Sequence, residues 1–136
     1  MAETLQLQIV TPEETINIDN VELVTLPGVV GEMGVYAQHV PLITQMVPGE
    51  IIVRKEGREQ LFAAGEGLIE IRADRVSVLT DLAIAADRID EVRVEEARRR
   101  AEARLHEKLS DEEVASVNAA LARSLAQLQV KRRQRR

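Results

Sequence analysis

All seven glycines and all four prolines of this 136-residue chain lie in residues 1–87, and residues 88–136 contain neither. Because glycine and proline break helices and form turns, the second segment can be helical throughout while the first cannot. The charge changes at the same point. Residues 1–87 carry five basic and fourteen acidic side chains, a balance of -9, and residues 88–136 carry thirteen and nine, a balance of +4, which together give the net charge of -5. We therefore expect two domains with these bounds.

The composition, 45% apolar and 30% charged, is that of a globular protein. A chain of this length buries roughly two-thirds of the surface that its unfolded form exposes, so its core needs no disulfide. The chain has no cysteine, which excludes thiol catalysis and sulfur-bound zinc and is compatible with a reducing compartment. The two aromatic residues, Tyr36 and Phe62, are too few to stack single-stranded bases, so we expect no nucleic acid partner.

The sequence also argues against membrane insertion, catalysis and metal binding. No apolar run approaches the roughly 20 residues that span a bilayer, and the first residues do not resemble a signal peptide. We therefore expect the chain in the cytosol or on the cytosolic face of a larger structure. His39 and His106 have no further ligands at metal-binding spacing, and no nucleophile is paired with a base beyond chance, so we expect neither a metal site nor an enzyme.

Short runs of alternating apolar residues, separated by turn residues, fill the first segment. The runs begin with Leu5, Leu7 and Ile9, with Ile16 and Ile18, and with Val21, Leu23 and Thr25, and they continue over 42–47, 51–55, 60–64, 68–71 and 76–79. The stretch between Gly28 and the run at 42–47 reads as irregular. Many short strands without intervening helices indicate antiparallel pairing, so we predict an antiparallel β-sandwich.

The second segment has helical periodicity. Asp90 is a candidate N-cap for a helix over about 90–108, with Val94, Ala97, Ala101 and Leu105 on one face. Ser110 and Glu113 form a capping box that begins a second helix. Its apolar positions are Val114, Val117, Leu121, Leu125 and Leu128, beside a stripe of alanines. We expect an α+β protein in which the sandwich is followed by an antiparallel two-helix hairpin, which buries little by itself and needs the sandwich or a partner to stay docked.

Several motifs, in the same order along the chain, resemble the epsilon subunit of bacterial F-type ATP synthases. They are the glycine-punctuated segment 26–36 with the His-Val-Pro-Leu-Ile segment 39–43, the strands 65–71 and 75–81, and Ile89-Asp90 followed by Arg93. The resemblance implies a non-catalytic rotor subunit. Its sandwich is expected on the gamma subunit and the ring of c subunits, and its hairpin is expected to extend towards the catalytic β (and α) subunits and inhibit ATP hydrolysis. It also implies a peripheral location on the cytoplasmic face of the cell membrane, reached only through the complex.

The resemblance assigns Glu32, Met33 and His39 to contact with c-ring loops, and the alternative is plain surface. The glycines of this loop have a structural interpretation as well, because glycine readily adopts positive φ. The segment is not a phosphate loop, since no Gly-Lys-Ser/Thr follows.

The resemblance also implies an ATP site formed by Asp90, Arg93, Arg100 and Arg123. The alternative is a solvated helix face on which arginines pair with Glu95, Glu96 and Glu102. Some family members carry a glutamate at the position of Ile84 and an arginine at that of Gln127. Both contributions are missing here, so we predict weak ATP binding and no obligatory cofactor.

The last six residues include Arg132, Arg133, Arg135 and Arg136. Cations complement the dipole at a helix C-terminus, which accounts for one or two of them, whereas a block of this kind usually binds a polyanion. The resemblance implies that they contact the acidic surface of the catalytic β subunits. Without the resemblance, the chain could instead be a free-standing nucleotide or anion sensor with an arginine-bearing helical lid.

Overall fold

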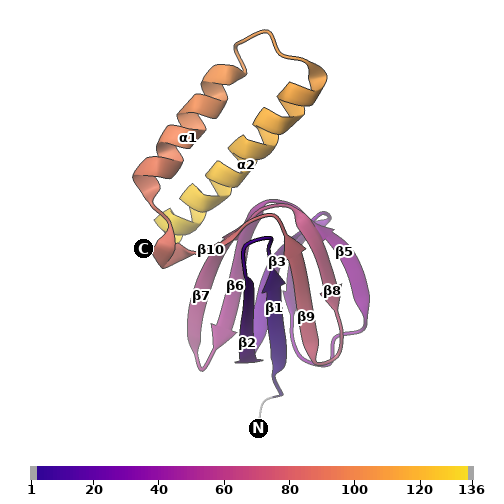
Figure 1. The fold of residues 1–136 in the computed structure, drawn as a ribbon. Coiled ribbons are helices and arrows are strands. Elements are labelled where there is room, and N and C mark those ends of the chain that lie inside the picture. The colour runs from indigo at the N-terminus through magenta and orange to yellow at the C-terminus, as the bar shows by residue number, and fades with distance from the viewer. Residues whose placement is uncertain (1–2, 135–136) are drawn as a thin grey trace.

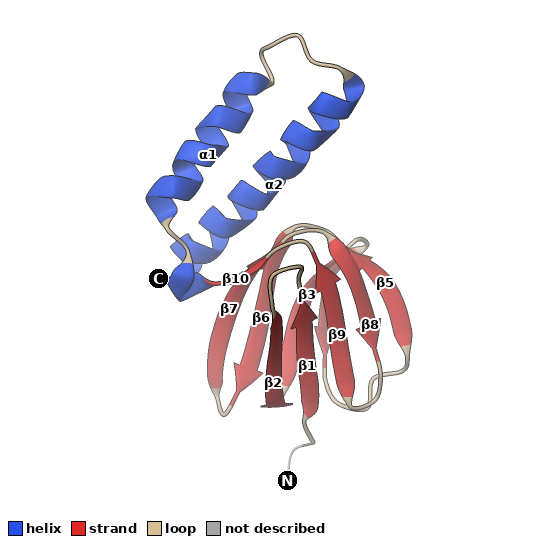
Figure 2. Ribbon diagram, in the orientation of Figure 1, coloured by secondary structure: helices blue, strands red, loops and turns tan. Residues whose placement is uncertain are grey.

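The computed structural model describes residues 3–134, which form ten strands, one short 3-10 helix and two α-helices (Figure 1). The strands are β1 Leu5–Val10, β2 Thr15–Val21, β3 Leu23–Gly28, β4 Gly31–Val35, β5 Leu42–Met46, β6 Gly49–Lys55, β7 Arg58–Ala64, β8 Gly67–Ile71, β9 Arg75–Thr80 and β10 Ala83–Ala85. The helices are η1 Ala86–Arg88, α1 Glu91–Arg104 and α2 Asp111–Gln134. The predicted α+β class, a β-sandwich followed by a two-helix hairpin, is confirmed (Figure 2).

The strands form one hydrogen-bonded sheet in the order β10-β7-β6-β3-β5-β8-β9-β1-β2, with β4 attached to β3, and the sheet curves over onto itself (Figure 1). Two features correct the sequence-based expectation. β1 runs parallel to β9, with Leu7 opposite Val76 and Ile9 opposite Val78, although only antiparallel pairs were expected. The stretch expected to be irregular contains β4, which pairs antiparallel with β3.

Alternating residues of the strands meet between the two layers and form the core. Leu5, Leu7 and Ile9 are buried as their alternation predicts. The alternation predicted from Val21 through Leu23 to Thr25 is wrong, because the chain is interrupted at Glu22 and the buried residues after Val21 are Val24 and Leu26. The break follows a positive φ of 58° at Asn20, and it places Val21 at the end of β2, with Ile16 and Ile18, while Leu23 begins β3.

Two glycines of the β3–β4 connection illustrate two different requirements. Gly31 has a φ of 139°, a conformation that L side chains rarely adopt. Gly28 has no such φ, but a Cβ there would lie 2.9 Å from the Gly31 carbonyl oxygen and 2.9 Å from Met33 Sδ. The glycines of this loop therefore serve close packing as well as positive φ.

The two helices form an antiparallel hairpin whose connecting loop is the part farthest from the sandwich (Figure 1). Asp90 caps α1 as predicted, with its Oδ1 accepting from the Arg93 backbone N–H at 3.3 Å. α1 ends at Arg104 rather than at about 108. α2 begins with the predicted capping box: Ser110 Oγ accepts from the Glu113 N–H, and Glu113 Oε1 accepts from the Ser110 N–H, both at 3.2 Å.

The buried face of α2 differs from the predicted stripe. Val117 and Leu128 are buried as expected, but Leu125 is 48% exposed and Val114 is at the surface, while Ala126 and Val130 are buried. A single apolar stripe covers only one side of a helix. The end of α2 instead packs against α1 and also against β6, β7 and η1, so its buried residues lie on more than one side.

Candidate functional surfaces

Helix α2 packs on the outer face of strands β6, β7 and β10. In the antiparallel register, Ala63 lies opposite both Glu50 and Ile84, and Leu61 lies opposite Ile52. Residues opposite each other in adjacent strands share a face of the sheet, so these five side chains point outwards, away from core residues such as Phe62. We call the set Glu50, Ile52, Leu61, Ala63 and Ile84 the platform.

The apolar contact between the hairpin and the platform forms a second, smaller core. Its buried members are Ala63, Ala86, Ile89, Val94, Leu128 and Val130, with Leu61 and Ile84 packed against them. Leu128 is 2% exposed and Val130 is fully buried. The hairpin is therefore held to the sandwich chiefly by the last turns of α2, where few large side chains contribute.

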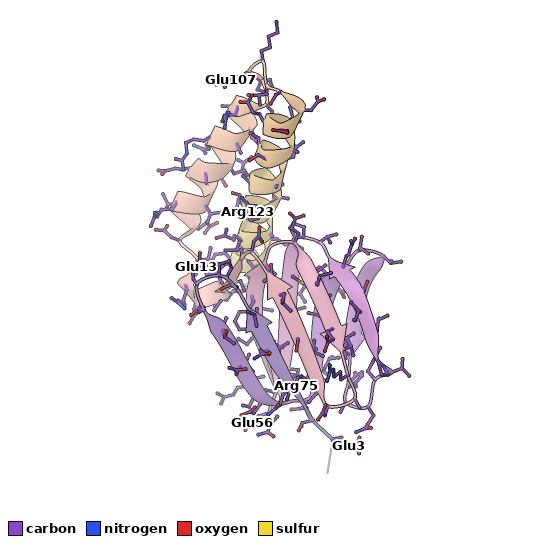
Figure 3. The ribbon with its side chains drawn as sticks, turned by 45° about the vertical axis from the view of Figure 1, so that its right-hand side comes forward. Glu3, Glu13, Glu56, Arg75, Glu107 and Arg123 are labelled. Atoms are coloured by element: carbon purple, nitrogen blue, oxygen red, sulfur yellow. The ribbon has the colours of Figure 1, made fainter. Side chains whose placement is uncertain are left out.

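Polar contacts from α2 surround this small core. Arg133 Nη1 donates to Glu50 Oε1 at 2.6 Å, and Lys131 Nζ donates to the Ala86 carbonyl oxygen at 3.1 Å. Farther up the helix, Arg123 Nη1 lies 3.3 Å from Asp81 Oδ2 in the turn between β9 and β10 (Figure 3). These contacts bring together residues that lie 42 to 83 positions apart in the sequence.

Glu50 has the most unusual environment of these charged groups. Its side chain is only 8% exposed, and its second oxygen, Oε2, is buried without a hydrogen-bond partner in the described part of the chain. Burial raises the pKa of the Glu50 carboxyl above its usual value, Arg133 acts in the opposite direction, and the carboxylates of Glu32 and Glu59 raise it further. The sequence analysis did not select Glu50; the signal available there was an acidic residue next to a run of apolar ones.

The arginines of the ATP-site hypothesis lie in separate settings. Arg123 is engaged by Asp81, and Asp90 serves as the helix cap. Within residues 3–134, the side chains of Arg93 and Arg100 make no hydrogen bond or ion pair. Apart from the cap bond from the Arg93 backbone to Asp90, no hydrogen bond or ion pair within residues 3–134 joins these four residues.

The salt-bridged face considered as the alternative does exist on α1, and within residues 3–134 it uses Arg98 and Arg104 rather than Arg93 or Arg100. Arg98 pairs with Glu95 and, at 2.6 Å, with Glu102. The hydrogen bond from Arg98 lowers the pKa of Glu95 below its usual value. Arg104 pairs with Glu113 across the interhelical loop at 3.5 Å.

The basic tail lies partly within the described residues. Arg132 is 3.6 Å from Glu91 and 3.5 Å from Glu95, so it joins the two helices, and Arg133 joins the hairpin to the sandwich. Arg135 and Arg136 lie outside the described residues. In the docked hairpin, the two described arginines of the tail therefore have intramolecular partners.

The three residues assigned to the c-ring lie on or next to β4. Glu32 is exposed, whereas Met33 is half-buried and packs against the sandwich core and over Gly28. His39 lies in the connection to β5, where its Nδ1 is 2.6 Å from the Val40 carbonyl oxygen. Glu32 and His39 present polar groups to solvent, and Met33 has a packing role.

A surface that the sequence analysis missed lies on β5, β8 and β9, on the side of the sandwich away from the hairpin (Figure 1). Leu68 and Leu79 are opposite each other in the register and are 49% and 52% exposed, and Ile43 on β5 is 69% exposed. A hollow of about 360 Å³ next to them is lined by Val29, Val47 and Leu68 among others. We call Ile43, Leu68 and Leu79 the apolar patch. The signal was present in the sequence, because Leu68 and Leu79 are apolar residues that violate the alternation.

The described residues contain neither a membrane-spanning helix nor a cluster of metal ligands. No helix in residues 3–134 is long and apolar enough to cross a membrane. In the same part of the chain, no group of three or more histidine, aspartate or glutamate side chains is arranged to hold a metal ion.

Comparison with known proteins gives consistent matches over most of the chain. Residues 4–86 match the family model of the ATP synthase delta/epsilon chain beta-sandwich domain, and residues 87–132 match that of the delta/epsilon chain long alpha-helix domain. The ATP synthase epsilon chain of Laribacter hongkongensis is 39% identical over 92% of this chain and 91% of its own length. The epsilon chain of Alkalilimnicola ehrlichii is 38% identical over 98% and 96%.

Solved structures share the fold. A chain in the Euglena gracilis mitochondrial ATP synthase structure of OSCP, F1 and c-ring has a TM-score of 0.78 at 23% identity, covering 95% of this chain and 81% of that one. A chain in the central stalk and c-ring structure of the Tetrahymena thermophila mitochondrial enzyme has a TM-score of 0.59 at 13% identity, covering 97% and 96%.

Proposed function

The chain belongs to the ATP synthase delta/epsilon chain family, and from this membership we propose what each of its two parts does in the complex. It has the role of the epsilon chains to which it is similar, that of a non-catalytic stalk subunit of ATP synthase. We propose that residues 1–87 attach the chain to the rotor and couple c-ring rotation to the catalytic head. Residues 88–136 form the regulatory part, which inhibits ATP hydrolysis.

The apolar patch is the observation that supports attachment through the sandwich. Three large apolar side chains on adjacent strands are between 49% and 69% exposed, which is costly unless a partner covers them. We assign this patch to contact with the gamma subunit. We assign the polar groups of Glu32 and His39, with Met33 beside them, to contact with the c-ring loops. In this arrangement the hairpin lies on the opposite side of the sandwich and is free to move.

The small docking area of the hairpin supports its regulatory role. The connecting loop projects from the sandwich, and among residues 3–134 the second core that holds α2 contains six buried residues. A helix pair attached so weakly can exchange its contacts with the platform for contacts with another subunit. We propose that the released hairpin extends towards the catalytic β (and α) subunits, where Arg132, Arg133, Arg135 and Arg136 meet acidic surface.

The proposal is tested with the ATP synthase complex reconstituted with the full chain or with a chain ending at residue 87. The shortened chain should still co-purify with gamma and support ATP synthesis, while ATP hydrolysis increases. Replacing Leu68 with Asp should weaken co-purification with gamma, whereas Val92→Asp, at a 68% exposed site on α1, should not. Failure of a folded 1–87 chain to bind gamma would contradict the assignment of the two parts.

The same preparation distinguishes this function from that of a free-standing sensor. A sensor purifies alone, whereas a stalk subunit purifies with gamma and the catalytic subunits.

We also propose that the chain lies at the cytoplasmic face of the cell membrane and meets the membrane only through the complex. ATP is not an obligatory ligand in this proposal.

A further inference from the structure

Glu50 is buried by the hairpin rather than by the sandwich core. It lies opposite Ala63 on the outer face of β6, and Ala63 is fully buried beneath the end of α2. The guanidinium that reaches Glu50 also belongs to α2, through Arg133 Nη1 at 2.6 Å from Oε1. When the hairpin leaves the platform, Glu50 loses this partner and regains contact with water.

The docked carboxylate is incompletely satisfied. One oxygen accepts from Arg133, but Oε2 is buried and has no hydrogen-bond partner among residues 3–134. Arg133 is itself half exposed, so part of its charge is screened by solvent. Within residues 3–134, the other charged groups that act on Glu50 are the carboxylates of Glu32 on β4 and Glu59 on β7, which repel a negative charge there. Docking therefore places a carboxylate where its ionised form is disfavoured.

We propose that Glu50 and Arg133 form a proton-sensitive latch, in which docking of α2 takes Glu50 out of water and thereby makes the docked hairpin bind a proton more tightly than the released hairpin. The latch deepens the proposed regulation by the hairpin, but the docking equilibrium is a property of the isolated chain. Lower pH favours the docked hairpin, and higher pH favours release.

The direction follows from proton linkage. Burial raises the pKa of Glu50 in the docked state, so the docked state carries more bound protons than the released state at pH values between the two pKa values. Docking therefore strengthens as the pH falls through the raised pKa of Glu50. The added stability of the docked hairpin is complete below the ordinary glutamate pKa of about 4.3. Glu95 and Glu113 have lowered pKa values, so their stabilising contributions are lost only as the pH falls below that ordinary range. Measurements above about pH 5 separate the two effects.

Spin labels on the full chain measure docking directly. Because the chain has no cysteine, cysteines introduced at two exposed positions, Asp74 on the sandwich and Asn118 on α2, carry the only labels. The distance distribution between them gives the ratio of docked to released hairpin between pH 8 and pH 5. In the chain with native Glu50 and Arg133, this ratio should rise as the pH falls.

Two variants assign the effect to the latch. Arg133→Ala should lower the ratio at pH 8 by roughly tenfold or more, since a buried carboxylate loses a charged hydrogen bond, and the ratio should recover as the pH falls and Glu50 is protonated. Glu50→Gln keeps an oxygen that accepts from Arg133 but removes the charge, so the hairpin should stay docked with no dependence on pH. His39 and His106 remain in Glu50→Gln and serve as internal controls.

Arg123→Ala is the matched control, because it removes another ion pair between α2 and the sandwich whose carboxylate, Asp81, is 43% exposed. This variant should keep the pH dependence of the unsubstituted chain. A docked fraction that does not change with pH, or a pH dependence that survives in Glu50→Gln, would overturn the latch. Both results concern the isolated chain, so neither of them tests the proposed role in the complex, which the reconstitution experiment tests separately.

Discussion

Arg123, in the middle of α2 and labelled in Figure 3, is paired with Asp81 in the turn between β9 and β10, and its Nη1 lies 3.3 Å from Asp81 Oδ2. The pair attaches the helix to the sandwich beyond the small apolar core at the end of α2. It also occupies an arginine that the ATP-site hypothesis requires for phosphate binding. An ATP molecule at this place would have to compete with a carboxylate that is already within hydrogen-bonding distance.

We predict that the isolated full-length chain binds ATP weakly. Ile84 cannot accept a hydrogen bond and packs against the second core, and Gln127 carries no charge. Each lost hydrogen bond to a charged group costs roughly 1.5–3 kcal/mol, so two losses weaken binding by a factor on the order of 100 or more relative to family members that have both residues. Titration calorimetry should give no micromolar binding.

The control for this prediction is Asp81→Ala, which frees Arg123. It should strengthen any residual ATP binding if Arg123 contributes to the site. Micromolar binding by the unsubstituted chain that is abolished by Arg93→Ala would show that the remaining arginines suffice and that the prediction is wrong.

Features set by local sequence were predictable, and features set by distant partners were not. The Asp90 cap and the Ser110–Glu113 capping box depend on residues three apart, and both appear as expected. The parallel pairing of β1 with β9 joins strands separated by most of the sandwich, and no local pattern reports it. Leu125 was expected at a contact because it fits a helical stripe, but the position of the sandwich beside α2 decides which sides of the helix are buried.

The same distinction applies to the candidate surfaces. The tail arginines were recognisable as a charge block, yet their docked partners depend on tertiary structure: Arg133 contacts Glu50, which is 83 residues away. The platform exists because β6 and β7 pair in a register that sets Glu50 beside Ala63. The sequence showed apolar residues in these strands without showing which of them face outwards.

The docking of α2 should depend on Leu128 and not on Leu125. Leu128 is 2% exposed in the second core. Leu125, the preceding residue of the predicted stripe, is 48% exposed. Replacing a buried leucine with alanine costs about 2–5 kcal/mol, so Leu128→Ala should release the hairpin. Leu125→Ala should change stability by less than about 0.5 kcal/mol. Hydrogen exchange of the α2 amides distinguishes the two, and equal protection in both variants would contradict the packing described.

Gly67 should be intolerant of a side chain because of close approach rather than backbone conformation. A Cβ at this position would lie 1.9 Å from the carbonyl oxygen of Leu79 in the adjacent strand. Gly67→Ala should therefore lower the free energy of unfolding by roughly 1–3 kcal/mol or more. At Gly34 the nearest atom is a Leu23 methyl group at 3.5 Å, so Gly34→Ala is the matched control and should change stability by less than about 0.5 kcal/mol. Urea denaturation of both variants measures the difference.

The last prediction concerns the basic tail in the assembled complex. If the tail steers the released hairpin to acidic surface on the catalytic β subunits, replacing Arg132, Arg133, Arg135 and Arg136 with alanine should relieve inhibition of ATP hydrolysis. The docked structure makes two separate double variants more informative. Arg132 and Arg133 also hold the hairpin to α1 and the sandwich, so their replacement promotes release while it weakens steering.

Replacement of Arg135 and Arg136 alone leaves the ion pairs of Arg132 and Arg133 in place, so increased hydrolysis in this variant would support steering by the tail. Exposed charges are screened over about 10 Å at 0.1 M salt, and raising the ionic strength should therefore reproduce part of the increase with the unsubstituted chain. Hydrolysis that responds neither to replacement of all four arginines nor to salt would contradict the steering role. The tail would then contribute only favourable charge at a helix end, worth about 0.3–1 kcal/mol for each exposed cation.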